Sequence, residues 1–465
     1  MYSDSLDPAF SIDGVTAYHG PAIDVLAALP EQSVSCVVTS PPYWAKRCYE
    51  GEHTIWGGDS DCQHEWLIPT VHGRLTGGGA RPPDSKWKGG PEYDVPTTTT
   101  TCRLCGAWRG QYGLEPTPEL YIEHSMLVLD ALWRVLRDDG VVWWNVGDTR
   151  AGSGCVPGGN DRESSTGSRG TWHGGPESTE KRHHPPSGLK PKDLCLIPLR
   201  FVMAAQERGW YVRSDVIWQK PNVKPESVKD RPTDSYEYIF MLTKSERYWY
   251  DMFAVREPSV KYEKEGPRLR TKPDGCGFDE VKQAGAPDQC AVTSHRNLRD
   301  VWSLTTHPYP GAHFAPFPPE LPRRCIEAGC PTEICLRCGR PRERIVEHQS
   351  ANYTAHCPKD AALIDQGMYG RGGRLHGPGF RKEDPGHTET VGWTDCGCGA
   401  EFMPGIVLDP FAGTGTTGMA AREVGRDCIL IEAAAEYIDQ MQVRLTMGDS
   451  EVRRRVKAER ESCHD

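Results

Sequence analysis

Residues 37–44 read VVTSPPYW and join an apolar run to two consecutive prolines and two aromatic residues. The valines extend the segment SVSCVV at 33–38, a pattern that predicts a buried strand. Proline lacks a backbone N–H and fixes φ at about −65°, so Pro41 and Pro42 end the strand and stiffen the turn that follows. The sequence therefore predicts a buried strand that ends in a rigid turn.

Helix and strand patterns alternate on both sides of this turn. Upstream, a short strand from Thr16 and an amphipathic helix complete a β-α-β unit with the buried strand. Downstream, the patterns predict a helix at 119–137, a strand at 141–147, a helix at 196–209, a strand at 211–220, a hairpin of 236–245 with 247–251, a short helix at 318–329, and strand, turn, helix, strand and helix at 405–445. This alternation predicts an α/β fold of three layers with a largely parallel sheet.

Composition narrows the class of protein. The 465 residues suffice for about two to four domains or for one large domain with insertions, and 49 Gly with 38 Pro predict long loops. No apolar run approaches ~20 residues and the N-terminus lacks a signal-peptide pattern, so we expect a soluble intracellular protein with no membrane partner. The net charge of −10 argues against a uniformly basic nucleic-acid binder, although Lys and Arg recur between Lys181 and Lys229.

A glycine-rich turn marks the second motif. Residues 409–418 read DPFAGTGTTG, after an apolar strand and before a helix, where glycine lets backbone N–H groups approach a ligand. Glu432 at the tip of the next strand is placed to take two ribose hydroxyls. We therefore expect a nucleoside ligand whose carboxylate, instead of a pyrophosphate, faces the helix N-terminus. A tight strand-to-helix turn without a ligand is the alternative.

Together the two motifs resemble the β class of S-adenosylmethionine-dependent DNA amino-methyltransferases. In that family a Ser, Asp or Asn followed by Pro-Pro and an aromatic residue precedes the cofactor motif, as Ser40 to Tyr43 precede Phe411 to Gly415 here. The resemblance covers about half of the chain, including WWNVGD, the stretch from KPKDL to WQKPN, PESVKDRPTDSYEYIFMLTKS and HFAPFPPELPRRCIEAGCP. It implies a Rossmann-like methyltransferase fold with a circularly permuted motif order. Where the family commonly has Gly-Asp before the first helix, this chain has Gly20-Pro21.

The resemblance also implies the chemistry of the proline turn. The lone pair of an exocyclic amino group is delocalised into the base, so acceptors on its N–H groups must make the nitrogen pyramidal. Ser40 and the carbonyl of Pro41, held by Pro42, supply those acceptors, and Tyr43 stacks on a base flipped out of the duplex. In the family, Ser at the first position favours the N4 amino group of cytosine, with the N6 group of adenine as the alternative. Transfer is a direct in-line displacement, and the chain has no Pro-Cys pair of the kind that methylates cytosine at carbon 5.

The cofactor pocket follows from the same family pattern. The methionine part of S-adenosylmethionine is expected to lie against the turn that follows the cofactor strand, and the block HFAPFP is expected to close the pocket. The residues are Asp409, Phe411, Gly413, Gly415 and Thr416 for the turn, Glu432 for the ribose, and His313 and Phe314 for the closing block.

The 18 cysteines include two sets with the spacing of metal ligands. The first set is Cys62, His64, Cys102 and Cys105, and the second is Cys335, Cys338, Cys396 and Cys398. Each set suits a tetrahedral structural zinc, and metal would supply folding energy to segments with little apolar surface. His356 with Cys357 competes for the second site, and free thiols are the alternative to both sites.

These elements define an expected domain organisation. We expect 12–58 as the first part of the methyltransferase domain with the catalytic motif, 59–109 as an inserted zinc-binding module, 110–257 as the central part with a mobile loop at 150–190, 258–300 as a linker or target-recognition segment, 301–331 as the cofactor-pocket helix, 332–403 as a second zinc-binding insert, 404–447 as the cofactor-binding part and 448–465 as a charged tail.

The expected function is site-specific methylation of double-stranded DNA at N4 of cytosine. A monomer or dimer in the cytoplasm of a bacterium or a phage-infected host is expected, alongside a separately encoded restriction endonuclease. Adenine methylation at N6 is the nearest alternative. A DNA-binding protein that keeps a vestigial methyltransferase fold and acts through zinc is another, and RNA or protein as methyl acceptor is a third.

Overall fold

The computed structural model of the chain describes residues 7–46, 53–67, 70–74, 92–96, 100–151, 189–190, 192–258, 295–307, 309, 316–348, 352–355, 380–384, 388–450 and 454. These residues divide into two compact units. The first unit spans 1–249, 300–332 and 404–465, and the second spans 250–299 and 333–403. Among the described residues, no helix has the length and apolar character needed to cross a bilayer.

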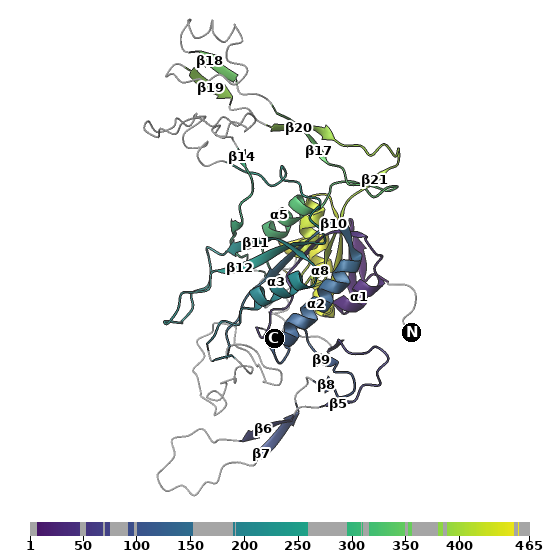
Figure 1. The fold of residues 1–465 in the computed structure, drawn as a ribbon, viewed down its shortest axis with the longest axis vertical. Coiled ribbons are helices and arrows are strands. Elements are labelled where there is room, and N and C mark those ends of the chain that lie inside the picture. Colours follow the sequence, from purple (N-terminus) through teal and green to yellow (C-terminus); the bar gives the residue numbers. More distant parts are fainter. Residues whose placement is uncertain are drawn as a thin grey trace. The chain divides into compact units, whose positions relative to one another are not determined.

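A nine-stranded mixed sheet forms the centre of the first unit (Figure 1). Its order is β1-β2-β23-β22-β3-β10-β12-β11-β15. β1 runs antiparallel to β2, and β12 runs antiparallel to both β10 and β11, whereas the remaining neighbouring pairs are parallel. The strands are β1 (Phe10–Ile12), β2 (Val15–His19), β3 (Val34–Thr39), β10 (Leu136–Val146), β11 (Tyr211–Gln219), β12 (Tyr236–Thr243), β15 (Val301–Ser303), β22 (Ile406–Asp409) and β23 (Asp427–Glu432). All six residues of β3 are buried, as expected for a central strand covered on both faces.

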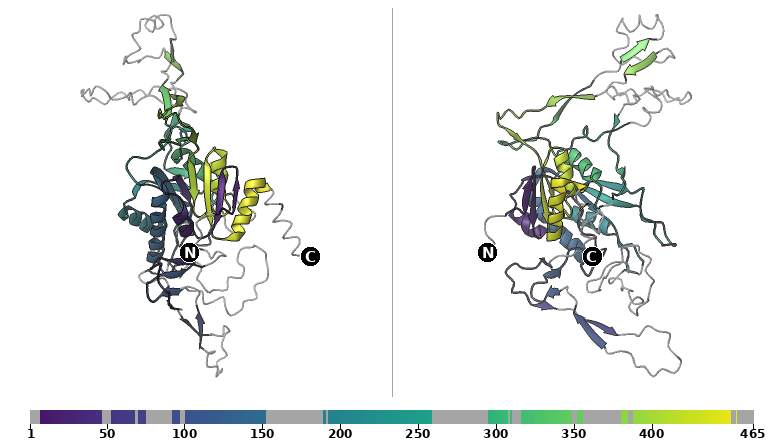
Figure 2. Two further views of the ribbon diagram at one scale, coloured as in Figure 1. Left: turned by 90° about the vertical axis from the view of Figure 1, so that its right-hand side faces the viewer. Right: turned by 180° about the vertical axis from the view of Figure 1, so that it is seen from behind.

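Helices cover both faces of the sheet and complete the three layers (Figures 1 and 2). One face carries α1 (Ala22–Ala28), α2 (Pro118–Val135) and α3 (Ile197–Glu207), and the other carries α5 (Glu320–Gly329), α7 (Thr416–Glu423) and α8 (Ala435–Met447). The start of α2 is set by Thr117, whose side chain accepts a hydrogen bond from the Leu120 amide, and by a proline at the first helical position. The predicted α/β class with helices on both faces is confirmed.

Two features of the sheet differ from the sequence prediction. The strands of the expected β-α-β unit, β2 and β3, are not neighbours, because β23 and β22 from the C-terminal part lie between them. The predicted hairpin is wrong: β12 pairs with β10 and β11, and 247–251 do not form a strand. The apolar periodicity of RYWYD arises from a buried Trp249 whose amide donates to the Asp139 carbonyl.

Residues 54–110 add a small sheet to the first unit. It has the order β4-β9-β8-β5, with β4 (Thr54–Trp56), β5 (Trp66–Leu67), β8 (Thr100–Cys102) and β9 (Trp108–Gly110). A separate ribbon pairs β6 (Thr70–Arg74) with β7 (Glu92–Pro96). Trp56 and Trp108 are buried and join the hydrophobic core of the first unit. This insert is therefore packed onto the core through its tryptophans.

The second unit consists of paired short strands. The pairs are β13 (Glu257–Pro258) with β14 (His295–Arg296), β16 (Ile334–Cys335) with β21 (Phe402–Met403), β17 (Arg344–His348) with β20 (Thr388–Trp393), and β18 (Asn352–Ala355) with β19 (Phe380–Asp384). Arg344 pairs with the buried carboxylate of Asp251 at 2.7 Å, which ties the two chain segments of the unit together. Most of the expected mobile loop at 150–190 and of the expected target-recognition segment at 258–300 lies outside the described residues.

Candidate active site

The proline turn leaves β3 at the centre of the sheet and is fixed by the segment that follows the insert. The indole N–H of the buried Trp44 donates to the Glu115 carbonyl at 2.9 Å, and the Ala45 amide donates to the Gly113 carbonyl at 2.7 Å. The Tyr121 hydroxyl donates to the Pro42 carbonyl at 3.0 Å. These three hydrogen bonds fix the proline turn to residues 113–121. They add to the rigidity that the two prolines predict.

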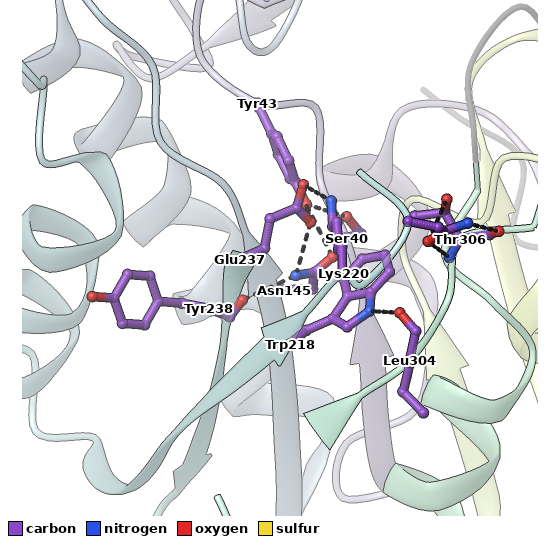
Figure 3. Close-up of polar contacts among 10 residues, drawn as sticks. Ser40, Tyr43, Asn145, Trp218, Lys220, Glu237, Tyr238, Leu304 and Thr306 are labelled. Atoms are coloured by element: carbon purple, nitrogen blue, oxygen red, sulfur yellow. Dashed lines mark hydrogen bonds and ion pairs between the residues drawn. The ribbon is translucent and has the colours of Figure 1, made fainter. Parts of the chain in front are cut away.

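The side chains of Ser40 and Tyr43 belong to a polar network (Figure 3). The Ser40 hydroxyl donates to the Tyr43 hydroxyl at 3.3 Å. The single proton of the Tyr43 hydroxyl has two acceptors, Glu237 Oε2 at 2.8 Å and Asn145 Oδ1 at 2.9 Å. Glu237 also forms an ion pair with Lys220. Burial alone would raise the pKa of Glu237, but the Lys220 ammonium, the hydrogen bond from Tyr43 and the charge of Lys46 together hold that pKa below its usual value.

The tyrosine ring is also constrained by its surroundings. A Cβ at Gly147 would lie 2.7 Å from Tyr43 Cε2, so only glycine leaves room for the ring against β10's end. The phenol is thus located by packing on its ring and by hydrogen bonds on its oxygen.

The glycine turn joins β22 to α7 beside the proline turn. Gly413 has φ of 51° and Gly415 has φ of 77°, both in the left-handed region that favours glycine. A Cβ at Gly413 would meet open space, whereas one at Gly415 would lie 2.5 Å from Met441 Cγ. Thr416 begins α7 and is buried. The turn therefore exposes backbone on one side and packs tightly on the other.

The carboxylates of Asp409, which is buried, and Glu432, which is half-buried, hold the glycine turn in place. Asp409 Oδ1 accepts from Thr39 Oγ1 at 2.7 Å and from the Phe411 amide at 3.1 Å, while Oδ2 accepts from Thr417 Oγ1 at 2.6 Å. Burial raises the pKa of Asp409 to about 6. Glu432 accepts from the Gly413 amide at 2.8 Å and from the Ala434 amide at 2.9 Å, and burial raises its pKa as well. Each carboxylate keeps lone pairs beyond these bonds, because ionised carboxylates offer about four acceptor sites.

One cavity of about 360 Å³ in the first unit brings the two turns together. The proline turn, the glycine turn, Glu432 and the network residues all line it, and Pro21 lies at its wall where the family has an acid. His313 and Phe314 lie outside the described residues, but Pro316 and Phe317 from the same block line the cavity. Its size fits a small-molecule site.

The structure also shows site residues that the sequence analysis did not single out. The cavity is lined by Asn145 of β10, Trp218 of β11, Lys220 directly after β11, and Glu237 of β12. The blocks WWNVGD, VIWQKPN and SYEYIF contain them, so a polar residue within each apolar block was the available signal. Asp148 accepts from the Ile197 amide at 3.1 Å, which gives it a structural part at the start of α3.

The first cysteine set forms a compact group of ligand atoms in the first unit. The ligand atoms of Cys62, His64, Cys102 and Cys105 all lie within 4.8 Å of one another. Cys62 Sγ is 3.8 Å from Cys102 Sγ, and Cys105 Sγ is 3.4 Å from His64 Nδ1. Zinc–sulfur bonds of about 2.3 Å at tetrahedral angles give a sulfur–sulfur separation of about 3.8 Å, so the donor set fits zinc.

The second cysteine set forms a similar group in the second unit. The four sulfur atoms of Cys335, Cys338, Cys396 and Cys398 also lie within 4.8 Å of one another, so these four residues meet as the spacing predicted. The competing pair, His356 with Cys357, lies outside the described residues.

Beneath the insert lies a buried acid–base pair that the sequence analysis missed. His124 Nδ1 is 3.0 Å from Glu115 Oε1, and both residues are buried. The rings of Trp56 and Trp108 stack on His124 at centroid distances of 5.2 and 5.3 Å. Glu115 Oε2 accepts from the Gly113 amide at 2.9 Å. This pair connects the insert to the segment that fixes the proline turn.

An α/β sheet whose carboxyl edge carries a proline turn and a glycine turn on one cavity defines a methyltransferase-like protein. The family model described as DNA methylase, for N6 and N4 enzymes, matches residues 34–333 and 401–443. The chain belongs to this family and is a DNA methyltransferase.

Named relatives agree with this assignment. The type II methyltransferase M.XycI of Xanthomonas campestris pv. cyanopsidis is 35% identical over 315 residues, which are 68% of this chain and 72% of that protein. The type II methyltransferase M.SmaI of Serratia marcescens is 28% identical over 431 residues, 92% of this chain and 89% of that protein. Among solved structures, the PvuII DNA methyltransferase (cytosine-N4-specific) aligns with a TM-score of 0.44 and 14% identity over 97% of this chain and 94% of that chain.

Proposed function

We propose that the protein is a site-specific DNA methyltransferase that moves a methyl group from S-adenosylmethionine to the N4 amino group of a flipped-out cytosine. The observation that carries this proposal is the single cavity that Ser40 and the glycine turn share. Methyl transfer requires the acceptor amine and the sulfonium to lie side by side, and this cavity has an acceptor-lined wall and a turn with exposed backbone next to each other.

The residues around the glycine turn fit S-adenosylmethionine. Open space beside Gly413 admits a close ligand, and lone pairs on Glu432 remain for ribose hydroxyls. The raised pKa of Asp409 reflects the burial of its carboxylate, and an ammonium group on the ligand would favour the charged form. The bound cofactor supplies an electrophilic methyl group, and Phe411, Gly415 and Thr416 complete the turn that would hold it.

The proline turn supplies the other half of the reaction. Ser40 Oγ and the Pro41 carbonyl accept the two amine protons, which localises the nitrogen lone pair towards the methyl group. The Pro42 carbonyl is already engaged by Tyr121, in keeping with Pro41 as the acceptor. Tyr43 and Trp218 line the cavity and offer rings against which a flipped base can stack.

Ser40 is also the reason for choosing cytosine over adenine. The family pattern associates Ser at the first position of the motif with N4 and Asp or Asn with N6, so N6 of adenine is the second candidate. Within this family, the order of the two motifs along the chain supports a circularly permuted fold. A vestigial, non-catalytic fold is disfavoured because Ser40 and the glycine turn both line one cavity.

We further propose that each four-residue cluster holds a structural zinc and that the enzyme acts beside a separately encoded restriction endonuclease. The zinc proposal rests on the ligand spacing at both clusters. The endonuclease proposal rests on the type II methyltransferase relatives.

The decisive experiment measures transfer of labelled methyl from S-adenosylmethionine to unmodified genomic DNA, followed by nucleoside mass spectrometry. N4-methylcytosine that disappears in Ser40→Ala is the expected result. N6-methyladenine would replace cytosine by adenine as the base, and the absence of any methylated nucleoside despite cofactor binding would refute the proposal.

A further inference from the structure

The acceptor role of Ser40 raises a problem that the family chemistry leaves open. A serine hydroxyl rotates freely and can donate or accept, whereas the target amine needs an acceptor. If the hydroxyl proton points at the amine nitrogen, it opposes the reaction instead of assisting it. Something in the site must therefore fix the direction of the Ser40 proton.

Glu237 is one end of a hydrogen-bond chain that does this (Figure 3). The Glu237 side chain is 14% exposed. It lies between Tyr43 and Lys220, the residue that directly follows β11. Lys220 is itself held over the Trp218 ring, 4.2 Å from the centroid, and the indole N–H donates to the Leu304 carbonyl at 2.9 Å. With an ammonium against one oxygen, Glu237 stays ionised and can only accept at the other oxygen.

Asn145 gives Tyr43 a second acceptor. Its Nδ2 group donates to the Tyr238 carbonyl at 3.0 Å and approaches Glu237 Oε2 at 3.5 Å, and both partners are acceptors. The amide must therefore turn its oxygen to Tyr43, whose hydroxyl donates to it at 2.9 Å. A phenol has one proton, so with acceptors on this side the Tyr43 oxygen accepts the hydrogen bond that Ser40 donates.

We propose that Tyr43 is a positioning residue whose hydroxyl, held by Glu237 and Asn145, accepts a hydrogen bond from the Ser40 hydroxyl and so leaves Ser40 Oγ to act as an acceptor for the target amine. The inference rests on the proposed function and adds a second task for the aromatic residue of the motif, beside stacking. Ser40 lines the cavity, so its remaining lone pairs can accept the amine proton there. Because the task belongs to the hydroxyl alone, it can be separated from the ring.

A double-mutant cycle tests this assignment in the full-length enzyme. The variants are Tyr43→Phe, Ser40→Ala and their combination, and the probes are radiolabelled S-adenosylmethionine and unmodified genomic DNA under single-turnover conditions. Tyr43→Phe keeps the ring and should lower the transfer rate by about tenfold, the equivalent of one hydrogen bond, while cofactor affinity and DNA affinity stay unchanged. In the Ser40→Ala background the same change should have no further effect, since its target is gone.

Ser40→Asp provides a second background, so that an undetectable rate in Ser40→Ala leaves the cycle measurable. An ionised Asp carboxylate carries no proton and offers only acceptors, and Tyr43→Phe should then change the rate by less than about twofold. Tyr238→Phe is the matched control, because it removes a hydroxyl from the neighbouring residue of β12, which points away from the network in Figure 3. Cofactor titration and thermal unfolding of each variant identify any that do not fold.

The outcomes separate this inference from the proposed function. Equal losses from Tyr43→Phe with and without Ser40 would overturn it, as would a full rate in the single variant. If the wild-type enzyme methylates DNA and the effects multiply, only the positioning role fails. If the wild-type enzyme makes no methylated nucleoside, the proposed function itself fails.

Discussion

Loss of the zinc proposed for the first cysteine cluster should slow methyl transfer, because the insert that carries this cluster also braces the proline turn. Cys105 lies three residues before β9, whose Trp108 is buried and stacks on His124. Residues 113–121, which follow β9, form the hydrogen bonds that hold the proline turn. We therefore expect Cys105→Ser to reach the active site without touching any cavity residue.

The magnitude follows from the bonds that would loosen. Three hydrogen bonds join the turn to residues 113–121, from Ala45 to Gly113, from Trp44 to Glu115 and from Tyr121 to Pro42. At about 1 kcal/mol net for each, the competent turn would lose up to about 3 kcal/mol. Since about 1.4 kcal/mol corresponds to tenfold, the rate should fall by up to about a hundredfold.

The assay compares Cys105→Ser with Cys338→Ser, the matched change at the second cluster. Metal analysis should find about one zinc fewer per chain in each variant, if each cluster holds one ion. Single-turnover methylation should fall in Cys105→Ser only, together with a change in tryptophan fluorescence from the loosened insert. A Cys105→Ser enzyme that has lost its zinc and keeps the wild-type rate would refute the link between insert and turn.

Three further changes test the cofactor side and the buried pair. Ionised Asp409 should attract the ligand's ammonium, so cofactor binding should strengthen as the pH rises through about 6, and calorimetry should show this dependence vanish in Asp409→Asn. Because the folded-state pKa lies above the ordinary value of 3.8, the ligand-free enzyme should instead lose stability as the pH rises from about 4 to about 6, as thermal unfolding would show. Gly415→Ala combines a left-handed φ with a clash on Met441 and should lower the free energy of unfolding by roughly 2 kcal/mol or more in denaturant titrations. Glu115→Gln removes the charged partner of His124 and should cost about 1–3 kcal/mol by the same measurement, with an unchanged cofactor affinity.

The sequence predicts those parts of the site that a local pattern defines. Apolar runs, prolines and glycines identify β3 with its proline turn and β22 with its glycine turn, because each depends on backbone rules that act within a few residues. The two four-residue groups of potential metal ligands were also predicted from the spacing of Cys and His, despite the long spacers between the two halves of each group. These features need no knowledge of which strands are neighbours.

The network around Tyr43 depends on strand pairing and was not predictable in this way. Asn145 and Tyr238 are brought together because β10 and β12 pair in an antiparallel register that sets Val146 opposite Tyr238. Lys220 reaches Glu237 because Gln219 is paired with Tyr236 in β11 and β12. A shift by one residue in either pair would turn these side chains to the other face of the sheet. The erroneous hairpin shows the same limit, since an apolar pattern does not say which strand it pairs with.

The sheet order also explains how motifs about 370 residues apart act as one site. β22 pairs with β3, setting Leu408 opposite Val37, so both strands end at the same edge. At that edge the last residue of β3, Thr39, donates to the last residue of β22, Asp409, at 2.7 Å. The next residue in each chain segment begins its turn, so the strand pairing and this buried hydrogen bond set the spacing between the proline turn and the glycine turn. Insertions elsewhere in the chain leave this spacing unchanged, because neither strand depends on the length of the connection between them.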